Sequence, residues 1–191
     1  MAIDVPARET AFQAELRGTS LTFSATWGLF SPKGIDAGTH LLIEHLDIQD
    51  GETCLDLGCG YGAIGITLAK YAQTSTVYMV DKDFVAIDYA RKNVEQNRLQ
   101  NCRVLLSNGF SHLPNIQFDL IVSNLPANVG KELLQIFLSD AKHYLKPNGR
   151  LYVVTISGLR EFIKRNFMTI FGNYRKVKQR NTHTVALATR A

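Results

Sequence analysis

The stretch TCLDLGCGYGAIG, Thr53 to Gly65, places three closely spaced glycines directly after a short apolar run. An apolar run that ends in glycines predicts a buried β-strand that turns sharply into a helix, because glycine accepts backbone angles that other residues resist. Such a turn lets the backbone approach a ligand at the start of the helix. The stretch therefore predicts the first strand, loop and helix of a nucleotide-binding sheet.

The alternation of strand-like and helix-like segments continues through the chain. Strands that alternate with helices predict a doubly wound, mostly parallel α/β sheet with helices on both faces. After the last helix, 174–180 and 184–189 predict an antiparallel C-terminal hairpin, so we expect a Rossmann-like sheet of seven strands. The other strand-like runs are 53–57, 76–80, 102–106, 118–122 and 151–155, and the helix-like stretches are 61–72, 83–97, 129–145 and 159–171.

The remaining segments predict the N-terminal part and two boundaries. Residues 12–26 predict a small hairpin or an irregular cap within the N-terminal segment 1–30, and 39–47 predicts an amphipathic helix. Asp83 has the position of an N-cap, and 146–149 predicts a turn into the fifth strand. Because the 191 residues are 46% hydrophobic and contain no repeat or linker, we expect a single domain over the whole chain, 1–191.

Cysteine spacing and composition narrow the class of protein. The three cysteines form no C-x-x-C pair, and their odd number does not suggest a disulfide framework, so a reducing cytoplasm is expected. The sequence has no stretch with the length and apolarity of a membrane span, and its N-terminus has no apolar leader segment. The histidines and cysteines show no metal-binding spacing. We expect a cytoplasmic protein without a metal or a membrane partner.

The charge is unevenly divided along the chain. Residues 1–141 contain 10 Lys and Arg against 16 Asp and Glu, whereas residues 142–191 contain 11 Lys and Arg and a single acid, Glu161. A basic region on an acidic body is a candidate surface for a polyanion such as RNA. Basic helix and strand ends that only face solvent would give the same composition. The sequence leaves both interpretations open.

The glycine loop fits two kinds of cofactor, and a neighbouring acid distinguishes them. Gly58, Gly60 and Ala63 satisfy the loose dinucleotide-binding pattern. Asp81 ends the next strand 21 residues after Gly60, where a carboxylate accepts ribose hydroxyls in either case. Asp56, just before the loop, would repel a pyrophosphate but favours an ammonium group, reached through water or backbone. S-adenosylmethionine (SAM) carries an ammonium and a sulfonium and no phosphate, so SAM is favoured.

The string DLGCGYG, residues 56–62, resembles the first motif of class I SAM-dependent methyltransferases, and Asp81 resembles the acid of their second motif. The resemblance implies SAM as the cofactor. It implies that Asn108 bonds the adenine amine and that Phe110 packs on the adenine ring, although a lone aromatic here is as often part of a core. The implied cofactor residues are Asp56, Gly58, Cys59, Gly60, Gly62, Asp81, Lys82, Asn108, Gly109 and Phe110.

The stretch SNLPAN, 123–128, follows the fourth strand at the edge where open α/β sheets bind ligands. The lone pair of an exocyclic amine is delocalised into the ring, so the amine is a poor nucleophile and must be oriented. If the side-chain oxygen of Asn124 and the carbonyl of Leu125 each accept an N–H, they orient the amine and stabilise its developing positive charge. We expect Asn124, Leu125 and Pro126 to form the catalytic slot of an N-methyltransferase.

Four short segments make the resemblance more specific. Over about residues 20–190, the chain resembles the small-subunit ribosomal RNA guanine-N2 methyltransferases and other proteins with a methyltransferase small domain. The resemblance implies that Asp36, Gly38 and Thr39 border the amino-acid end of SAM, that guanine N2 is the acceptor, and that residues 142–191 contact RNA. The segments are Gly28-Leu29-Phe30-Ser31, Asp36-Ala37-Gly38-Thr39, Asn124-Leu125-Pro126 and Gly130-Lys131-Glu132.

Two departures from the family pattern leave alternatives open. Leu125 stands where the family has a first proline, and Ala127 stands where it has an aromatic residue that stacks on the target base. Trp27 or Phe30 could supply that aromatic face, or either could be packing. The alternatives are a SAM- and RNA-binding module with weak or no catalysis, and methylation of a protein glutamine or a small amine. A dinucleotide oxidoreductase is more distant.

Overall fold

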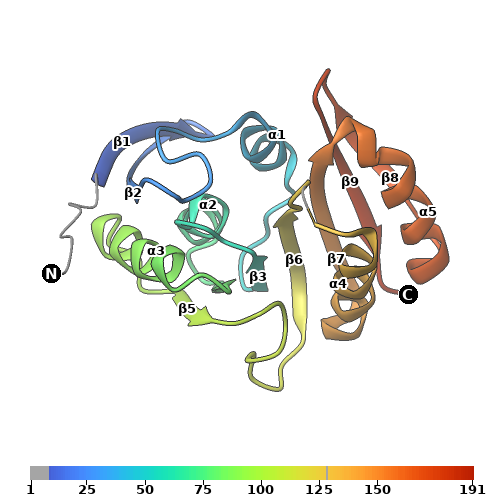
Figure 1. Ribbon diagram of the computed structural model, residues 1–191. Helices are drawn as coiled ribbons and strands as arrows, with labels where there is room; N and C mark the ends of the chain where they lie inside the picture. The colour runs from blue at the N-terminus through green and yellow to red at the C-terminus, as the bar shows by residue number, and fades with distance from the viewer. Residues whose placement is uncertain (1–8, 128) are drawn as a thin grey trace, which may run out of the picture.

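The computed structural model describes residues 9–127 and 129–191, so the first eight residues of the predicted N-terminal segment and Asn128 lie outside the described residues. The main sheet has seven strands in the order β5-β4-β3-β6-β7-β9-β8 (Figure 1). The first five in this order are parallel to one another, and β9 pairs antiparallel with β7 and with β8. The predicted doubly wound, mostly parallel α/β sheet with an antiparallel C-terminal hairpin is confirmed.

The strands and helices follow the predicted alternation. The strands are β1 (Glu9–Leu16), β2 (Thr19–Thr26), β3 (Thr53–Leu57), β4 (Thr76–Asp81), β5 (Cys102–Leu106), β6 (Phe118–Asn124), β7 (Leu145–Ile156), β8 (Arg175–Gln179) and β9 (His183–Thr189). The helices are α1 (Ala37–His45), α2 (Ala63–Tyr71), α3 (Phe84–Gln96), α4 (Lys131–Tyr144) and α5 (Arg160–Phe171), with a short 3-10 turn, η1 (Ser157–Leu159), before α5.

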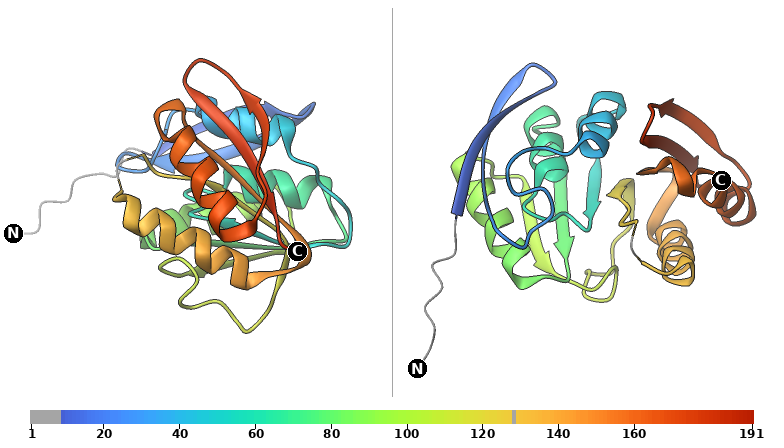
Figure 2. Two further views of the ribbon diagram at one scale, coloured as in Figure 1. Left: turned by 90° about the vertical axis from the view of Figure 1, so that its right-hand side faces the viewer. Right: turned by 45° about the horizontal axis from the view of Figure 1, so that its top comes forward.

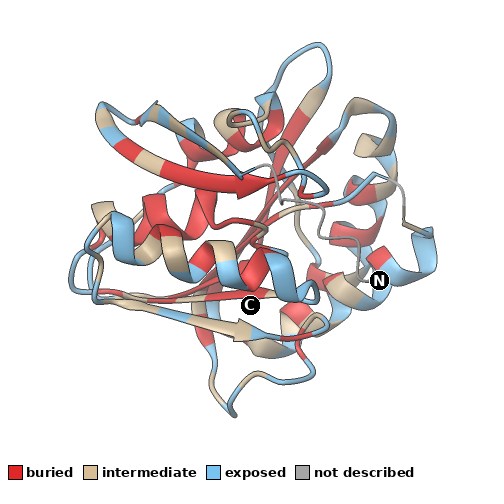
Figure 3. Cartoon of the chain, turned by 60° about the vertical axis from the view of Figure 1, so that its left-hand side comes forward, coloured by how far each residue is buried: buried red, intermediate tan, exposed pale blue. Residues whose placement is uncertain are grey.

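Successive side chains on the central strands point to opposite faces of the sheet, as the period of a β-strand requires. On β6, Leu120 and Val122 belong to the core beneath α1, α2 and α3, whereas Ile121 between them belongs to the core beneath α4 and α5. Both faces are therefore apolar and covered, which is what a parallel sheet needs. Figure 3 shows the buried residues gathered on the strands and on the inward faces of the helices.

β1 and β2 form a separate hairpin that packs beside α3. Arg17 and Gly18, at its tip, have φ angles of 51° and 77°, and positive φ at both central residues is the requirement of a type I′ turn. Phe12 and Phe23 pack with Tyr61 of the glycine loop, with ring centroids 5.6 to 5.9 Å apart. Of the hairpin and the irregular cap that the sequence left open for 12–26, the structure has the hairpin, which covers the loop from one side.

Asn93 on α3 and Asn97 at its C-cap pair with the edge of β2 that β1 leaves open. The Asn93 side chain accepts from the N–H of Ser24 at 2.7 Å and donates to the Ser24 carbonyl at 2.9 Å. Asn97 makes the same pair of bonds with Thr22, at 3.1 and 2.7 Å. Asn93 is fully buried and also donates to the Tyr61 carbonyl at 2.8 Å. Because a side-chain amide carries the same donor and acceptor as a peptide group, the helix satisfies the strand edge as another strand would.

Helix α1 begins two residues earlier than the sequence predicts. The carboxylate of Asp36 accepts the N–H groups of Gly38 at 2.9 Å and Thr39 at 3.1 Å, which makes Asp36 the N-cap of the helix. The N-cap predicted for α3 is confirmed, because Asp83 accepts the N–H of Val85 at 2.9 Å. The cap of α1 places the side chains of Asp36 and Thr39 at the helix end that faces β6.

Strand β7 begins at Leu145, before the turn that the sequence predicts ahead of 151–155. Leu145 pairs with Phe118 on β6, and the register then shifts so that Arg150 pairs with Leu120. The predicted turn is therefore an irregularity within the strand rather than a connection before it. Asn148 has a φ of 63° there, a conformation that Asn tolerates better than most residues.

The C-terminal hairpin and α5 lie at one end of the sheet, and the β1–β2 hairpin lies at the other (Figure 2). β9 begins at His183, inside the predicted connection, because His183 pairs with Ile156 of β7. This pairing draws the start of β9 toward the edge of the sheet where β6 ends. Within the described residues, no helix has both the length and the hydrophobicity to cross a bilayer.

Replacing Asn93 by Ala should destabilise the fold by about 2–4 kcal/mol, because buried groups of Ser24 and Tyr61 would lose their hydrogen-bond partners. Urea unfolding followed by circular dichroism should show a lower midpoint with an unchanged slope. The control is Glu95→Ala, an exposed position on the same helix, which should change the free energy of unfolding by less than about 0.5 kcal/mol. Equal effects of the two substitutions would contradict the role of the Asn93 amide.

Candidate active site

A cavity of about 560 Å³ lies where the strand order of the sheet reverses. β4 pairs with one side of β3 and β6 with the other, so the connections leave toward opposite ends of the sheet and a crevice remains between them. The glycine loop, the ends of β4 and β6, the start of α1 and one side of α4 line this cavity. The predicted substrate edge and the predicted cofactor loop therefore meet in one place.

The glycine loop directs its N–H groups into the protein. The N–H groups of Gly58 and Cys59 both donate to the carbonyl of Val80 at 2.9 Å. The N–H of Gly62 donates to the Cys59 carbonyl, also at 2.9 Å. Gly58, Gly60 and Gly62 have φ angles of 75°, 55° and 98°, so a side chain at any of them would strain the loop. A loop that binds phosphate needs free N–H groups, and this geometry does not favour the dinucleotide alternative.

Asp81, at the end of β4, both braces the loop and lines the cavity. Its Oδ2 accepts the N–H of Gly60 at 2.9 Å, and its Oδ1 accepts the N–H of Asp83 at 3.0 Å. Each carboxylate oxygen has a second lone pair, so Asp81 can still accept ligand hydroxyls. Lys82 is exposed beside it and also lines the cavity.

Asp56 lies beneath the loop, fully buried, and does not line the cavity. Its Oδ2 accepts the N–H of Gly65 at 2.8 Å, whereas its Oδ1 has no hydrogen-bond partner among the described residues. Burial raises the pKa of the Asp56 carboxyl to about 7 against the opposing N–H of Gly65, and the charge of Asp81 adds to the shift. Asp56 therefore contacts the backbone of the first turn of α2, and its side chain does not reach the cavity.

Asn124 ends β6, and its amide is held in one orientation. The Asn124 Nδ2 lies 2.9 Å from the Thr39 Oγ1 and 3.4 Å from each carboxylate oxygen of Asp36. A carboxylate can only accept, so the amide nitrogen must face Asp36. The Asn124 side chain lines the cavity, and its oxygen is left free of this network. The start of α1 therefore decides which atom of the amide is available to a substrate.

The residues around Asn124 are fixed by the sheet. The N–H of Leu125 donates to the Val154 carbonyl at 3.0 Å, and its side chain is buried. Ser123 donates to the Leu57 carbonyl at 2.7 Å, which ties the end of β6 to the end of β3. Leu125, Pro126 and Ala127 all line the cavity. The hydrogen bond to β7 supplies part of the rigidity that a proline at position 125 would give.

The aromatic residue beside Asn108 and Gly109 differs from the one that the sequence suggests. Asn108 and Gly109 line the cavity, but Phe110 is buried in the core, where it stacks on Tyr144 with ring centroids 4.8 Å apart. The expectation that Phe110 covers a ligand ring is therefore corrected. Phe137 of α4 lines the cavity instead, and a side chain at Gly109 would meet its ring at 3.1 Å. The sequence gives no sign of this, because Phe137 lies on an ordinary amphipathic helix.

His183 is a cavity residue that sequence reasoning does not identify. It lies at the start of β9, lines the cavity, and shares a hydrogen bond of 2.9 Å between its Nδ1 and Thr182. A Cβ added at Gly38 would lie 2.8 to 3.0 Å from the His183 ring and 3.0 Å from Asp36 Oδ1. Gly38 itself does not line the cavity, so glycine is needed there to let the imidazole approach the N-cap of α1.

The mouth of the cavity is apolar. Phe30 is 70% exposed and lines the cavity, and Leu133 and Ile156 are about two-fifths exposed and line it as well. Trp27 is 82% exposed but does not line the cavity. Of the two aromatic residues that could replace the missing one at position 127, Phe30 is therefore the one in position to do so.

Cys59, which the resemblance places among the cofactor residues, lines the cavity. Its thiol is buried, and burial raises the pKa of that thiol well above its ordinary value, with the charges of Asp56 and Asp81 adding to the shift. A neutral thiol is a poor nucleophile.

Across 9–127 and 129–191, no three His, Cys, Asp or Glu side chains are grouped as a metal site would require.

The structure neutralises part of the basic C-terminal region. Arg180 pairs with Glu44 and Arg160 with Glu161. Lys146 pairs with Asp119, and Arg150 pairs with Asp47 and Glu52. The basic residues of 142–191 that form no ion pair with a described residue gather mainly on α5 and β8. They are Lys142, Lys164, Arg165, Arg175, Lys176, Lys178 and Arg190.

The sheet has a carboxylate at the end of β4 that can still accept ribose hydroxyls, and its glycine loop offers few N–H groups to a phosphate. This is the arrangement of SAM-dependent methyltransferases. The comparison with known sequences is more specific. This chain belongs to the methyltransferase small domain family, whose model matches residues 20–186. The family that the motifs suggest is thereby confirmed.

Three relatives illustrate the similarity. The uncharacterized protein YbxB of Bacillus subtilis is 33% identical over 152 residues, which cover 78% of this chain and 76% of that protein. The 16S rRNA N2 methyltransferase RsmC of T. thermophilus, in complex with AdoMet and guanosine, superposes with a TM-score of 0.89 at 29% identity. That match covers 97% of this chain and 52% of RsmC, so this chain spans about half of its length. A Pyrococcus furiosus methyltransferase shares the fold, with a TM-score of 0.68 at 23% identity over 86% of this chain and 90% of that one.

SAM is the cofactor of this protein, and the residues of the cavity fit it. The carboxylates of Asp36 and Asp81 come from α1 and β4 and suit the ammonium group and the ribose hydroxyls of SAM. Lys82 is the one lysine or arginine among the described residues that line the cavity. A cavity with more carboxylates than cations is suited to a positively charged ligand without phosphate.

The stability of the fold should depend on pH through Asp56. An unfolded Asp ionises near pH ~4, so from about pH 4 to about pH 7 the folded state holds one more proton than the unfolded state, and stability falls as pH rises. Asp56→Asn keeps an acceptor for Gly65 and cannot ionise. The free energy of unfolding of the variant relative to wild type should therefore rise by about 2–3 kcal/mol between pH 5 and pH 8.

Urea unfolding at the two pH values measures this difference. Asp88→Asn, at an exposed carboxylate, is the control and should follow wild type. Identical pH dependence of wild type and Asp56→Asn would show that the Asp56 carboxyl ionises alike in both states.

Proposed function

We propose that this protein transfers a methyl group from SAM to an exocyclic amine, and that the amine is guanine N2 of small-subunit ribosomal RNA. The observation that carries the proposal is the Asn124 amide, whose nitrogen is held by Asp36 and Thr39 while its side chain lines the cavity. The likeness to RsmC, a 16S rRNA N2 methyltransferase whose structure is in complex with AdoMet and guanosine, supports this acceptor.

In this proposal, acceptors on opposite walls of the cavity hold the cofactor. Asp81 accepts the ribose hydroxyls, and Asn108 bonds the adenine amine while Phe137 packs against the ring. Asp36 and Thr39, at the start of α1, border the amino-acid end. When bound, SAM supplies a methyl group that its positively charged sulfur activates.

The catalytic contribution of the chain is to orient a weak nucleophile. The Asn124 oxygen and the Leu125 carbonyl accept the two N–H groups of the amine, so that its lone pair points along the line of transfer. The same acceptors stabilise the positive charge that develops on the nitrogen. Asp36 and Thr39 keep the Asn124 amide from turning its nitrogen toward the amine, which would replace an acceptor by a donor. The amine therefore needs no strong base to remove a proton before it attacks the methyl group.

Two surfaces support an RNA substrate. The apolar mouth with the exposed Phe30 suits a base that is turned out of its stack. The cations of α5 and β8 that form no ion pair with described residues suit a phosphate backbone.

The cytoplasm is the location that goes with this substrate, and all three cysteines are free, as in a reducing compartment.

Asn124→Ala should lower kcat for methyl transfer by about 100-fold or more, because one of two amine acceptors is lost. The affinity for SAM should be nearly unchanged. Tritiated-methyl transfer to ribosomal RNA from cells that lack the gene measures the first, and calorimetry measures the second. Asp81→Ala is the reciprocal control and should weaken SAM binding first. Loss of SAM affinity in Asn124→Ala as large as the loss of turnover would refute the assigned role.

Phe30→Ala should lower kcat/KM for the RNA by about 10- to 100-fold, since base–aromatic stacking is worth about 1–3 kcal/mol. Phe30→Tyr keeps an aromatic face and should restore most of the activity. Trp27→Ala removes an aromatic residue that does not line the cavity and should have little effect. The opposite ranking of Phe30→Ala and Trp27→Ala in the same transfer assay would assign the stacking face to Trp27.

A further inference from the structure

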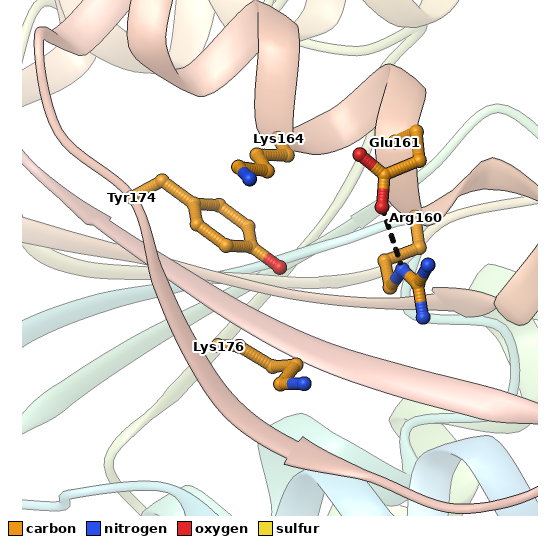
Figure 4. Close-up of a pocket in the computed structure, with 5 residues that line it drawn as sticks. All are labelled: Arg160, Glu161, Lys164, Tyr174 and Lys176. Atoms are coloured by element: carbon orange, nitrogen blue, oxygen red, sulfur yellow. Dashed lines mark hydrogen bonds and ion pairs between the residues drawn. The ribbon is translucent and has the colours of Figure 1, made fainter.

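A small hollow of about 300 Å³ lies between α5 and β8, outside the active-site cavity. We call it the α5–β8 notch. Its charged and polar side chains come from the first two turns of α5 and from the start of β8, and Figure 4 shows the Tyr174 hydroxyl directed among them. The residues that line the notch are Arg160, Glu161, Lys164, Tyr174 and Lys176.

The notch carries an excess of positive charge. Arg160 pairs with Glu161 at 2.9 Å, but the Glu161 side chain is 69% exposed, so the pair is weak and screened by solvent. Lys164 and Lys176 form no ion pair with any residue that the structure describes. Three cations thus face one carboxylate. A ligand with negatively charged oxygens would relieve the repulsion among the cations.

Tyr174 supplies a neutral donor between the cations. Burial raises the pKa of its hydroxyl, and the charge of Glu161 adds to the shift against the opposing charge of Arg160. The hydroxyl therefore stays protonated and can donate. Two ammonium groups and one hydroxyl around a small hollow are the donors that a tetrahedral oxyanion requires.

The notch is close to the mouth of the cavity along the chain. Ile156 lines the cavity, and η1 is the whole connection from Ile156 to Arg160, a span of at most about 14 Å. The turn between β8 and β9 is a second connection between the notch and the cavity. Gln179 accepts from Arg160 at 3.3 Å and from Lys176 at 3.4 Å, and β9 begins just beyond it at His183, which lines the cavity.

We propose that the α5–β8 notch binds a backbone phosphate of the RNA a few nucleotides away from the base that enters the cavity. Lys164, Lys176 and Tyr174 donate to the phosphate oxygens, and Arg160 can leave its exposed partner to join them. The contact is independent of the base sequence, so it positions the strand and does not select the target. This inference rests on the proposed function, because it takes the partner to be RNA.

The test compares two charge-matched double variants by fluorescence anisotropy with a labelled single-stranded RNA oligonucleotide of mixed sequence. Lys164→Gln with Lys176→Gln removes two cations from the notch. Arg98→Gln with Arg103→Gln removes two exposed cations beside β5, the strand at the opposite edge of the sheet. Circular dichroism and SAM calorimetry should show that both variants fold and bind the cofactor as wild type does.

The notch variant should bind the RNA roughly tenfold more weakly at low salt, as loss of a charge-assisted hydrogen bond implies. The slope of log affinity against log salt should become shallower by about 0.7, because one phosphate contact to a single strand is lost. The variant of the opposite edge should keep the affinity and slope of wild type. Tyr174→Phe, which removes only the hydroxyl, should give a smaller loss of affinity.

An unchanged salt slope in the notch variant, or an equal loss in the opposite-edge variant, would overturn the proposal. So would competition by polyglutamate as strong as that by unlabelled RNA, since the surface would then respond to charge alone. The two hypotheses fail separately. A wild-type protein that binds RNA through the notch but methylates no ribosomal RNA would refute the proposed function alone. Methylation of RNA by wild type, with full RNA binding by the notch variant, would refute the notch alone.

Discussion

The glycine loop keeps its shape because its backbone donors find their acceptors inside the sheet. The Val80 carbonyl takes two of them, and the Asp81 carboxylate takes the N–H of Gly60. The Asp56 carboxylate takes the N–H of Gly65 in α2, the helix that follows the loop. These hydrogen bonds satisfy the backbone groups of the tight turns in which the glycines have positive φ angles. The conformation of the loop is thus set by the ends of β3 and β4.

The active site depends on a second network that joins two distant parts of the chain. Asp36 caps α1 and at the same time holds the amide nitrogen of Asn124 at the end of β6. Asp36, which is proposed to border the cofactor, therefore also orients Asn124, which is proposed to receive the substrate. A displacement of α1 would disturb both together. Because His183 packs against Gly38 in the same cap, the C-terminal hairpin is tied to this network as well.

The sequence predicts those features that depend on local pattern. The apolar runs and the glycines around 58–62 identify the sheet, the loop and the end of β6, and the motif resemblance identifies the family. Contacts between distant segments could not be read in this way. Phe110 is the aromatic residue that the sequence suggests for ring packing, and only the packing of α4 shows that Phe110 belongs to the core and that Phe137 lines the cavity. His183 reaches the cavity through the antiparallel pairing of β9, which no local pattern specifies.

The side-chain amides of Asn93 and Asn97 do more than stabilise α3. A strand edge with unpaired peptide groups is a template for other chains, and these two amides occupy alternate residues along the edge of β2. At the far end of the molecule, the short edge strand β8 carries Arg175, Lys176 and Lys178, whose charges discourage pairing in another way. A chain in which both asparagines are replaced should therefore self-associate through β2 during synthesis. Its defect would be seen as a low yield of protein before it was seen as poor catalysis.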